Sequence, residues 1–411
     1  MQWQKFRLGE ICEIYDCPHT TAPDEGEGYA LVRTPNVGKG RLIFDKMHRV
    51  CKEVYDRRNK RAVPRAGDII FAREAPAGNA ALITEGQEVC LGQRTVLLRP
   101  NHKIADSAFL TYCIISPKVQ ERLLGISHGS TVSHVNMPDI VNLEVPLPTL
   151  STQYAIGKKL SQYDQLIENN TRRIAILEAK AEQLYKEWFV RRQSPEHSAT
   201  TGVTLSLGDA IKISRGLSYT SSEIDTDAGV QLINLKNIQP YGGFRYDGTK
   251  RFSGKYKPDQ IVVRGDLVMG VTDMTQDRRA VGSVALMPPL KETSVISADL
   301  IKIEPKIDKL FLYAMLRYGG LSRYISQFAN GANVLHLRPQ SIMGIKVQLP
   351  SKEFIERFSA RLRPMIALAD NLNEQNALLA KERDLLLPRL MSGRLSCAAH
   401  ESAPSQEEAL P

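Results

Sequence analysis

The chain repeats itself at an offset of about 200 residues, and such a duplication restricts the fold more than any single motif does. Leu8-Gly9-Glu10 near the start corresponds to Leu207-Gly208-Asp209. Arg65-Ala66-Gly67-Asp68 and Arg264-Gly265-Asp266 each precede an apolar run, which is typical of a turn that leads into a buried strand. Because the matches follow the same order, the sequence predicts two copies of one domain.

Each copy ends on an apolar segment that closes with proline, from Ile140 to Pro148 and from Ile342 to Pro350. Short apolar runs and polar turns precede this segment, together with an apolar helical segment that begins at Phe109 or Phe311. About 150 residues is a normal domain size. We therefore expect an α/β fold class with two β-rich α/β domains in tandem.

Behind each closing proline, apolar residues recur at steps of three and four, which is the pattern of a coiled-coil seam. Each stripe could pack into its own domain. Since the duplication gives each domain one such helix, we favour two long antiparallel coiled-coil helices that pack on each other with pseudo-twofold symmetry and separate the domains. Asn170 and Gln375 would fix the register, and Pro364 should kink the second helix or begin a new one. The predicted seam residues are Leu160, Ile167, Asn170, Ile174, Leu177, Leu184, Trp188, Met365, Leu368, Leu372, Gln375, Leu379 and Leu386.

These patterns divide the chain into six regions. We expect the first domain at residues 1–150, the first long helix at 151–192 and a polar linker at 193–202. The second domain follows at 203–350 and the second long helix at 351–392. The composition of residues 393–411 predicts a disordered tail.

The net charge of +9 favours a polyanionic partner, because basic side chains that bind phosphates release condensed counterions. The start lacks the apolar core of a signal peptide, and no apolar run approaches the roughly 20 residues that cross a bilayer. We therefore expect a soluble, cytoplasmic protein. The six cysteines form no CxxC pair, and Cys12, Cys17 and His19 lack the further ligand that a zinc site needs, so we expect no metal.

Several catalytic motifs are absent from the sequence. It contains no GxxxxGK[ST] phosphate loop, no [ND]PP[YF] element of amino-methyltransferases and no HExxH helix. We expect a chain that is not an enzyme by itself and binds no cofactor. One nuclease-like fragment, Asp299 with Glu304-Pro305-Lys306, offers carboxylates for Mg²⁺; the alternative is the polar end of a strand and a turn.

Polar side chains suited to DNA gather in the turns of both copies. Lys and Arg contact phosphates, whereas Asn, Gln, Arg and Ser read base edges. For any one residue the alternative is an ordinary surface position, and for His134 and His336, which occupy matching positions, it is a turn-stabilising role. The loops differ between the copies while the framework strands agree, which fits one scaffold that reads two sequences. The candidate DNA-binding residues are Asn36, Lys39, Arg41, Arg57, Arg58, Lys60, Arg73, Gln93, Arg94 and His134 in the first copy and Asn234, Lys236, Asn237, Asp273, Gln276, Arg278, Arg279, Asn333 and His336 in the second.

From Leu8 to Gly393 the sequence resembles the specificity subunit of type I restriction-modification systems. The duplicated opening, the Gly-Asp turns, the closing strands and the end Leu385-Leu386-Leu387-Pro388-Arg389-Leu390-Met391-Ser392-Gly393-Arg394 carry the resemblance. It implies two target-recognition domains that each read one half of a split site in double-stranded DNA, with the helices as a ruler for the unread spacer. It also implies two modification subunits that use S-adenosylmethionine to methylate adenine, and restriction or motor subunits that use ATP and Mg²⁺ in phage defence. A free-standing or architectural DNA-binding protein and a self-sufficient nuclease are the alternatives.

Overall fold

The computed structural model describes residues 3–44, 46–125, 134–191, 202–225, 228–246 and 248–395. The chain falls into two compact units, of which unit 1 comprises Met1–Asn170 and Gln375–Pro411 and unit 2 comprises Thr171–Glu374. Each unit therefore contains one β-rich domain and one segment of each long helix. The predicted linker and tail lie almost wholly outside the described residues.

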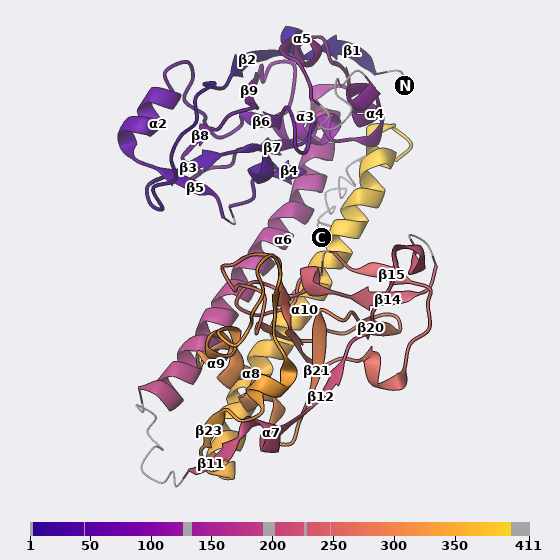
Figure 1. The fold of residues 1–411 in the computed structure, drawn as a ribbon. Helices are drawn as coiled ribbons and strands as arrows, with labels where there is room; N and C mark the ends of the chain where they lie inside the picture. Colours follow the sequence, from indigo (N-terminus) through magenta and orange to yellow (C-terminus); the bar gives the residue numbers. More distant parts are fainter. Residues whose placement is uncertain are drawn as a thin grey trace, which may run out of the picture. The chain divides into compact units, whose positions relative to one another are not determined.

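Unit 1 is built around a five-stranded sheet with the strand order β2-β9-β6-β7-β4 (Figure 1). A three-stranded sheet, β5-β3-β8, and the pair β1-β10 complete its strands. Helix α3 packs against β7, and Phe71, Phe109 and Leu110 are fully buried in the core between the main sheet and the helices. The elements are β1 (Gln4–Arg7), α1 (Leu8–Ile11), β2 (Cys12–Asp16), β3 (Tyr29–Val32), β4 (Gly40–Arg41), β5 (His48–Val50), α2 (Lys52–Arg58), β6 (Ile69–Ala72), β7 (Ala80–Leu82), β8 (Val89–Leu91), β9 (Thr95–Pro100), α3 (Ser107–Ile114), α4 (Pro117–Gly125), α5 (Met137–Val141) and β10 (Glu144–Leu147).

Unit 2 repeats this arrangement, as the duplication predicts. Its sheets have the orders β12-β21-β17-β19 and β13-β15-β14-β20-β16, and β11 pairs with β23 as β1 pairs with β10. The elements are β11 (Val203–Ser206), α7 (Leu207–Ala210), β12 (Ile211–Arg215), β13 (Ile224–Asp225), β14 (Val230–Ile233), β15 (Lys250–Phe252), β16 (Ile261–Val262), β17 (Leu267–Gly270), β18 (Thr272–Asp273), β19 (Val284–Leu286), β20 (Ser294–Ile296), β21 (Leu300–Pro305), α8 (Lys309–Arg317), α9 (Leu321–Ser326), β22 (Leu335–His336) and β23 (Lys346–Leu349).

The repeated motifs fold in the same way because, in each copy, side chains of the motif accept hydrogen bonds from nearby backbone amides. Glu10 accepts a hydrogen bond from the Arg7 amide at 2.7 Å, and Asp209 accepts one from the Ser206 amide at 3.2 Å, so both short helices begin on the same cap. In the Gly-Asp turns, Gly67 and Gly265 have φ of +91° and +78°, a left-handed conformation that glycine adopts without a Cβ clash.

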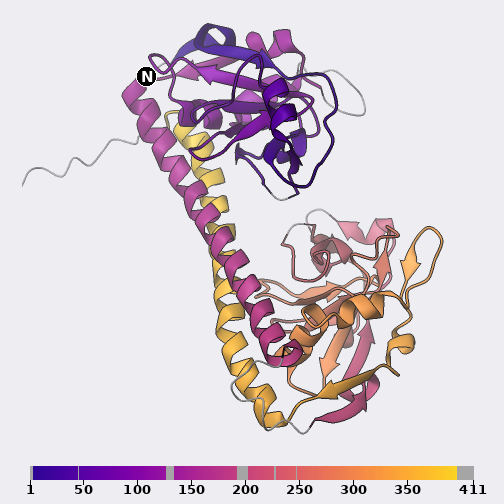
Figure 2. The same cartoon turned by 90° about the vertical axis from the view of Figure 1, so that its left-hand side faces the viewer.

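The long helices α6 (Leu150–Tyr185) and α10 (Lys352–Met391) contribute antiparallel, side-by-side segments to each unit (Figures 1 and 2). In unit 1, Leu160 of α6 and Leu387 and Leu390 of α10 share the core of the first domain. In unit 2, the ring of Trp188, which follows α6, packs against the ring of Phe354 of α10 with a centroid distance of 4.8 Å. Both kinds of packing that the sequence allows therefore occur, since in each unit the helices pack on each other and also into the core of the domain.

Most predicted seam residues are buried or half-buried, but the phase on α10 is wrong at two positions. Leu368 is 40% exposed and Gln375 is exposed, whereas the residues one position later, Ala369 and Asn376, are half-buried. Successive helical residues differ by about 100° in direction, so a shift of one position moves a side chain off the interface. The sequence prediction placed Leu368 in the seam because leucine is more apolar than Ala369. The packing of the neighbouring turns, however, determines which face of α10 is buried.

Of the two outcomes predicted for Pro364, the start of a new helix is wrong, because α10 continues from Lys352 to Met391, and the kink stays a prediction. A proline inside a helix costs about 3 kcal/mol, since one backbone hydrogen bond is lost. Phe358 and Leu362, within two turns of Pro364, are fully buried in the core of unit 2, and their packing offsets this cost. Neither long helix is apolar enough to cross a membrane, nor is any other helix in the described ranges.

Candidate DNA interface

In unit 1, several sequence-predicted DNA-binding residues meet at one edge of the main sheet. Strands β2 and β6 end there and β9 begins there, because both pair antiparallel with β9. We call the set Asp16, His19, Arg73, Glu74, Gln93, Arg94 and His134 the first loop edge.

Hydrogen bonds and ion pairs connect this first loop edge. The Arg73 guanidinium lies 3.1 Å from Nε2 of His134 and 3.5 Å from Asp16, and Arg94 forms an ion pair with Glu74. The amide of Gln93 donates to the carbonyl of His19 at 2.7 Å. Arg73 is mostly buried, whereas Gln93 and Arg94 are exposed, so these two can reach a ligand without breaking the buried contacts.

The corresponding edge of unit 2 lies where β12 and β17 end and β21 begins. His336 on β22 pairs with Thr272 on β18, and His134 forms a bridge with Glu74 at the matching place. The two histidines therefore occupy equivalent positions, as predicted. We call the set Arg215, Met274, Gln276, Arg278, Arg279, Asn333, His336 and Arg338 the second loop edge.

The two loop edges differ most in one connection. In unit 1 the Gly78 amide donates to the carbonyl of Ala72, and in unit 2 the Gly282 amide donates to that of Gly270. The same scaffold positions are thus joined by the short segment 73–77 in one domain and by the longer segment 271–281 in the other. This confirms that the loop differs while the framework agrees.

Asp273, a candidate DNA contact, instead folds the longer segment. Its buried carboxylate accepts hydrogen bonds from the amides of Thr275, Ala280 and Val281 and from the Thr275 hydroxyl, at 2.7 to 3.3 Å. Burial raises the pKa of Asp273, but these donors outweigh it and hold the pKa below its ordinary value. Because its carboxylate oxygens already accept these hydrogen bonds, Asp273 has a structural role in the segment 271–281.

Three asparagines are also corrected from base readers to scaffold residues. Asn36 and Asn237 are buried at equivalent places, and each donates at 3.1 Å to the carbonyl seven or eight residues later, that of Ile43 or Arg245. Buried Asn234 donates to the carbonyl of Gly248 at 2.8 Å. Because buried amides need partners, these side chains hold the turns together and do not face a ligand.

The basic run of α2 contains two kinds of residue. Arg58 is 5% exposed and donates to the carbonyls of Leu91, Thr20 and Pro18 at 2.6 to 3.2 Å. Burial lowers the pKa of Arg58, and the three carbonyl oxygens take the place of water around its charge. Arg57 and Lys60 are exposed and stay candidates for phosphate contact.

We expect Arg58→Met to destabilise the first domain by about 3 kcal/mol, because it leaves buried carbonyls without a donor. The neighbouring control, Arg57→Gln, should leave the free energy of unfolding unchanged within about 0.5 kcal/mol. Urea denaturation of both variants measures this difference. Equal stability of the two variants would show that Arg58 is an ordinary surface residue.

The remaining candidates lie outside the loop edges. Lys39 and Arg41 flank Gly40, where an added Cβ would lie 2.9 Å from the carboxylate of Asp164 on α6. Lys236 is exposed on the turn held by Asn234. Sequence reasoning missed Asp16, Glu74, Arg215 and Met274, because their roles depend on strand ends that meet only in the folded sheet.

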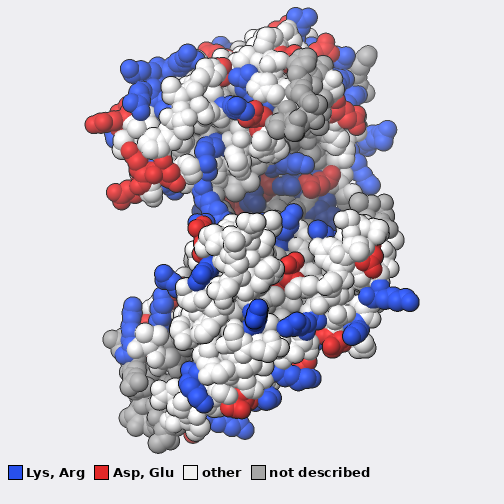
Figure 3. Space-filling model, in the orientation of Figure 1, with Lys and Arg blue, Asp and Glu red and all other residues white. Residues whose placement is uncertain are grey.

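Charge alone does not locate an interface. On the face in Figure 3, Lys and Arg side chains are scattered over both units with Asp and Glu among them. The loop edges are therefore defined by the fold and by their polar contacts.

The nuclease-like fragment does not form a metal site. Asp299 precedes β21 and accepts from the Thr272 hydroxyl at 2.9 Å, whereas Glu304 near the other end of β21 pairs with Lys212 at 3.2 Å. Five residues of strand separate the carboxylates by about 16 Å, too far for them to share one ion. Within the described ranges no group of three or more His, Cys, Asp or Glu side chains is placed to hold a metal.

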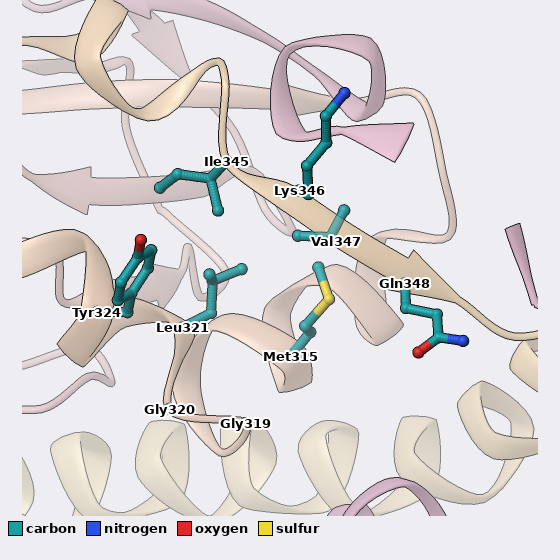
Figure 4. Close-up of a pocket in the computed structure, with 9 residues that line it drawn as sticks. All are labelled: Met315, Gly319, Gly320, Leu321, Tyr324, Ile345, Lys346, Val347 and Gln348. Carbon is teal, nitrogen blue, oxygen red and sulfur yellow. The ribbon is translucent and has the colours of Figure 1, made fainter. Parts of the chain in front are cut away.

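Unit 2 also contains an open cavity of about 310 Å³ between the α8–α9 turn and β23 (Figure 4). It is lined by Met315, Leu321, Tyr324, the glycines at 319 and 320, and residues 345–348. Lys346 points away from Met315 and Leu321 (Figure 4). No residue of the second loop edge lines this cavity, so it is separate from the candidate DNA interface.

Comparison with known proteins connects both domains to one family. A family model described as the type I restriction modification DNA specificity domain matches residues 1–179. The type I restriction enzyme MjaVIII specificity subunit of Methanocaldococcus jannaschii is 23% identical over 417 residues, which cover 96% of this chain and 93% of that protein. The HindI specificity subunit of Haemophilus influenzae is 21% identical, over 82% of this chain and 88% of its own.

A solved structure supports the fold assignment. The crystal structure of the type I restriction-modification system S subunit from M. genitalium covers 95% of this chain and 96% of its own, with 16% sequence identity and a TM-score of 0.58. A likeness at this identity concerns the fold. The first repeat thus matches the type I restriction modification DNA specificity domain, and the chain as a whole is similar in sequence to specificity subunits of type I restriction enzymes.

Proposed function

We propose that each domain reads one half of a bipartite site in double-stranded DNA through its own loop edge. The observation that carries this proposal is a repeated scaffold with different loop edges. Asn36 and Asn237 donate equivalent hydrogen bonds in the two domains, so the turns between the strands have the same structure in both. The exposed side chains on it differ, so the two domains would read different sequences.

The long helices would set the length of the unread spacer and bind two modification subunits. Each helix passes from one unit into the other, and exposed leucines such as Leu166, Leu378 and Leu385 remain on their outer faces. The modification subunits would use S-adenosylmethionine to methylate adenine, and restriction or motor subunits would use ATP and Mg²⁺. The chain itself would be non-catalytic, hold none of these cofactors and act in the cytoplasm.

The test is to co-express the chain with its modification subunit and map methylated adenines in genomic DNA by single-molecule sequencing. The expected result is a split motif with a fixed unread spacer. A soluble, assembled complex that methylates no such motif would contradict the proposal.

Replacing residues 271–281 by the shorter segment 73–77 should change only the second half-site. Each mismatched base pair costs about 1–3 kcal/mol, so methylation of the native motif should fall at least about fivefold. The first half-site is the internal control. Loss of recognition in both halves would point to misfolding, and retention of both would show that this segment does not read DNA.

A further inference from the structure

The second loop edge carries a short two-stranded ribbon whose equivalent in the first domain is a single bridge. Thr272 and Asp273 of β18 pair antiparallel with His336 and Leu335 of β22. His336 also pairs with Asn330, so the segment before β22 forms a second narrow turn. The ribbon thus joins two protruding segments, 271–281 and 330–336.

Hydrogen bonds fix this ribbon internally. Asp273 binds the backbone at Thr275, Ala280 and Val281, as described above. The Gln276 side chain donates to the carbonyl of Ala332 at 2.9 Å and links the two protruding segments, and Arg278 donates to the Gln327 side chain at 2.8 Å. Because these hydrogen bonds already hold the ribbon in one conformation, a side chain beside it can bind a ligand without the entropy cost of ordering a loop.

Met274 follows the last residue of β18 directly and is 79% exposed, more than any other large apolar side chain in the described ranges. A single exposed apolar residue is ordinary by itself. Here the residues on both sides of it, Asp273 and Thr275, are held by hydrogen bonds, and the polar or basic residues Gln276, Arg278 and Arg279 follow in the same segment. The fold therefore displays an apolar group at a defined place within a polar surface.

We propose that the β18–β22 ribbon enters the major groove and that Met274 contacts the 5-methyl group of a thymine in the second half-site. The major groove, about 12 Å wide, admits a two-stranded ribbon, and the 5-methyl group of thymine lies in this groove. Methionine has no hydrogen-bond donor, and the thymine methyl is the apolar group that base edges present there. This inference rests on the proposed function and assigns one base preference within it.

The first domain should lack this preference. Its corresponding segment is shorter and has Ala75 and Pro76 after Glu74. A thymine effect that depends on Met274 should therefore be confined to the second half-site.

The test uses the assembled complex and synthetic duplexes that carry the mapped motif. Each thymine of the second half-site is replaced in turn by deoxyuridine, which lacks only the 5-methyl group. At one position the wild-type complex should bind the uracil duplex about fourfold more weakly, the effect of one buried methyl group. The Met274→Ala complex should bind both duplexes equally.

Val263→Ala provides the matched control, because Val263 is 57% exposed in the same domain, before the turn that opens β17. This variant should keep the wild-type ratio of thymine to uracil binding. A second half-site without thymine, or a uracil effect that Met274→Ala leaves unchanged, would overturn the inference while the proposed function stands. A complex that binds no split motif would overturn the proposed function itself.

Discussion

Inserting four residues into each long helix, after Asn170 in α6 and before Gln375 in α10, should lengthen the unread spacer by one to two base pairs and leave both half-sites unchanged. Four helical residues add about 6 Å, and successive base pairs are about 3.4 Å apart. Insertions at the boundary between the units leave the contacts within each unit in place. Methylation at the original spacing should then fall to background.

Methylation mapping of the lengthened variant reads both half-sites and the spacer in one experiment. A four-residue insertion between Glu85 and Gly86 is the control, because Gly86 lies in a turn where an added Cβ meets no atom within 4 Å. The control should methylate the original motif. An assembled, active complex with lengthened helices and an unchanged spacer would count against the ruler.

Asp164→Ala should destabilise unit 1 by about 3 kcal/mol, because it removes the buried partner of Arg383, which keeps only the exposed Asp384, and the acceptor of the Tyr112 hydroxyl. Asp164 on α6 accepts from the Tyr112 hydroxyl of α3 at 2.5 Å and forms an ion pair with Arg383 of α10, and all three side chains are nearly buried. Burial, followed by the charge of Asp164, raises the pKa of Tyr112, so its hydroxyl stays protonated and donates. Burial lowers the pKa of Arg383, but Asp164 and Asp384 together outweigh burial and raise this pKa.

The two tryptophans make this prediction measurable, because Trp3 lies in unit 1 and Trp188 in unit 2. In a Trp188→Phe background, the fluorescence of Trp3 follows the urea unfolding of unit 1. Glu178→Ala is the control, since Glu178 pairs with Arg317 in unit 2 and its loss should shift the unfolding transition of unit 1 by less than about 0.5 kcal/mol. If Asp164→Ala also costs less than about 1 kcal/mol, the buried cluster does not attach the helices to the first domain.

The repeated framework was predictable because its signals are local. The caps at Glu10 and Asp209 and the glycine turns before Asp68 and Asp266 involve residues close in sequence. Both copies fold alike because each signal satisfies its own backbone. The positions of His134 and His336 followed from the repeat in the same way.

The candidate site was only partly predictable. Asn36, Asn237 and Arg58 have the side chains of DNA contacts, yet each is buried among backbone carbonyls from distant turns. Sequence gives the donor capacity of a side chain but not the location of the acceptor. Whether Arg57, Gln93, Arg94 or Gln276 contacts DNA remains a prediction.

The sequence by itself determined the duplication, the fold class and the two long helices, since these depend on periodicity and short-range hydrogen bonding. Tertiary structure alone decided which face of α10 is buried, which polar residues are consumed by the scaffold and which side chains meet at the loop edges. The physical reason is that burial and hydrogen-bond pairing arise between strands and helices far apart in the chain. The position of the exposed Met274 also depends on tertiary structure, because the pairing of β18 with β22 fixes where the residue after β18 lies.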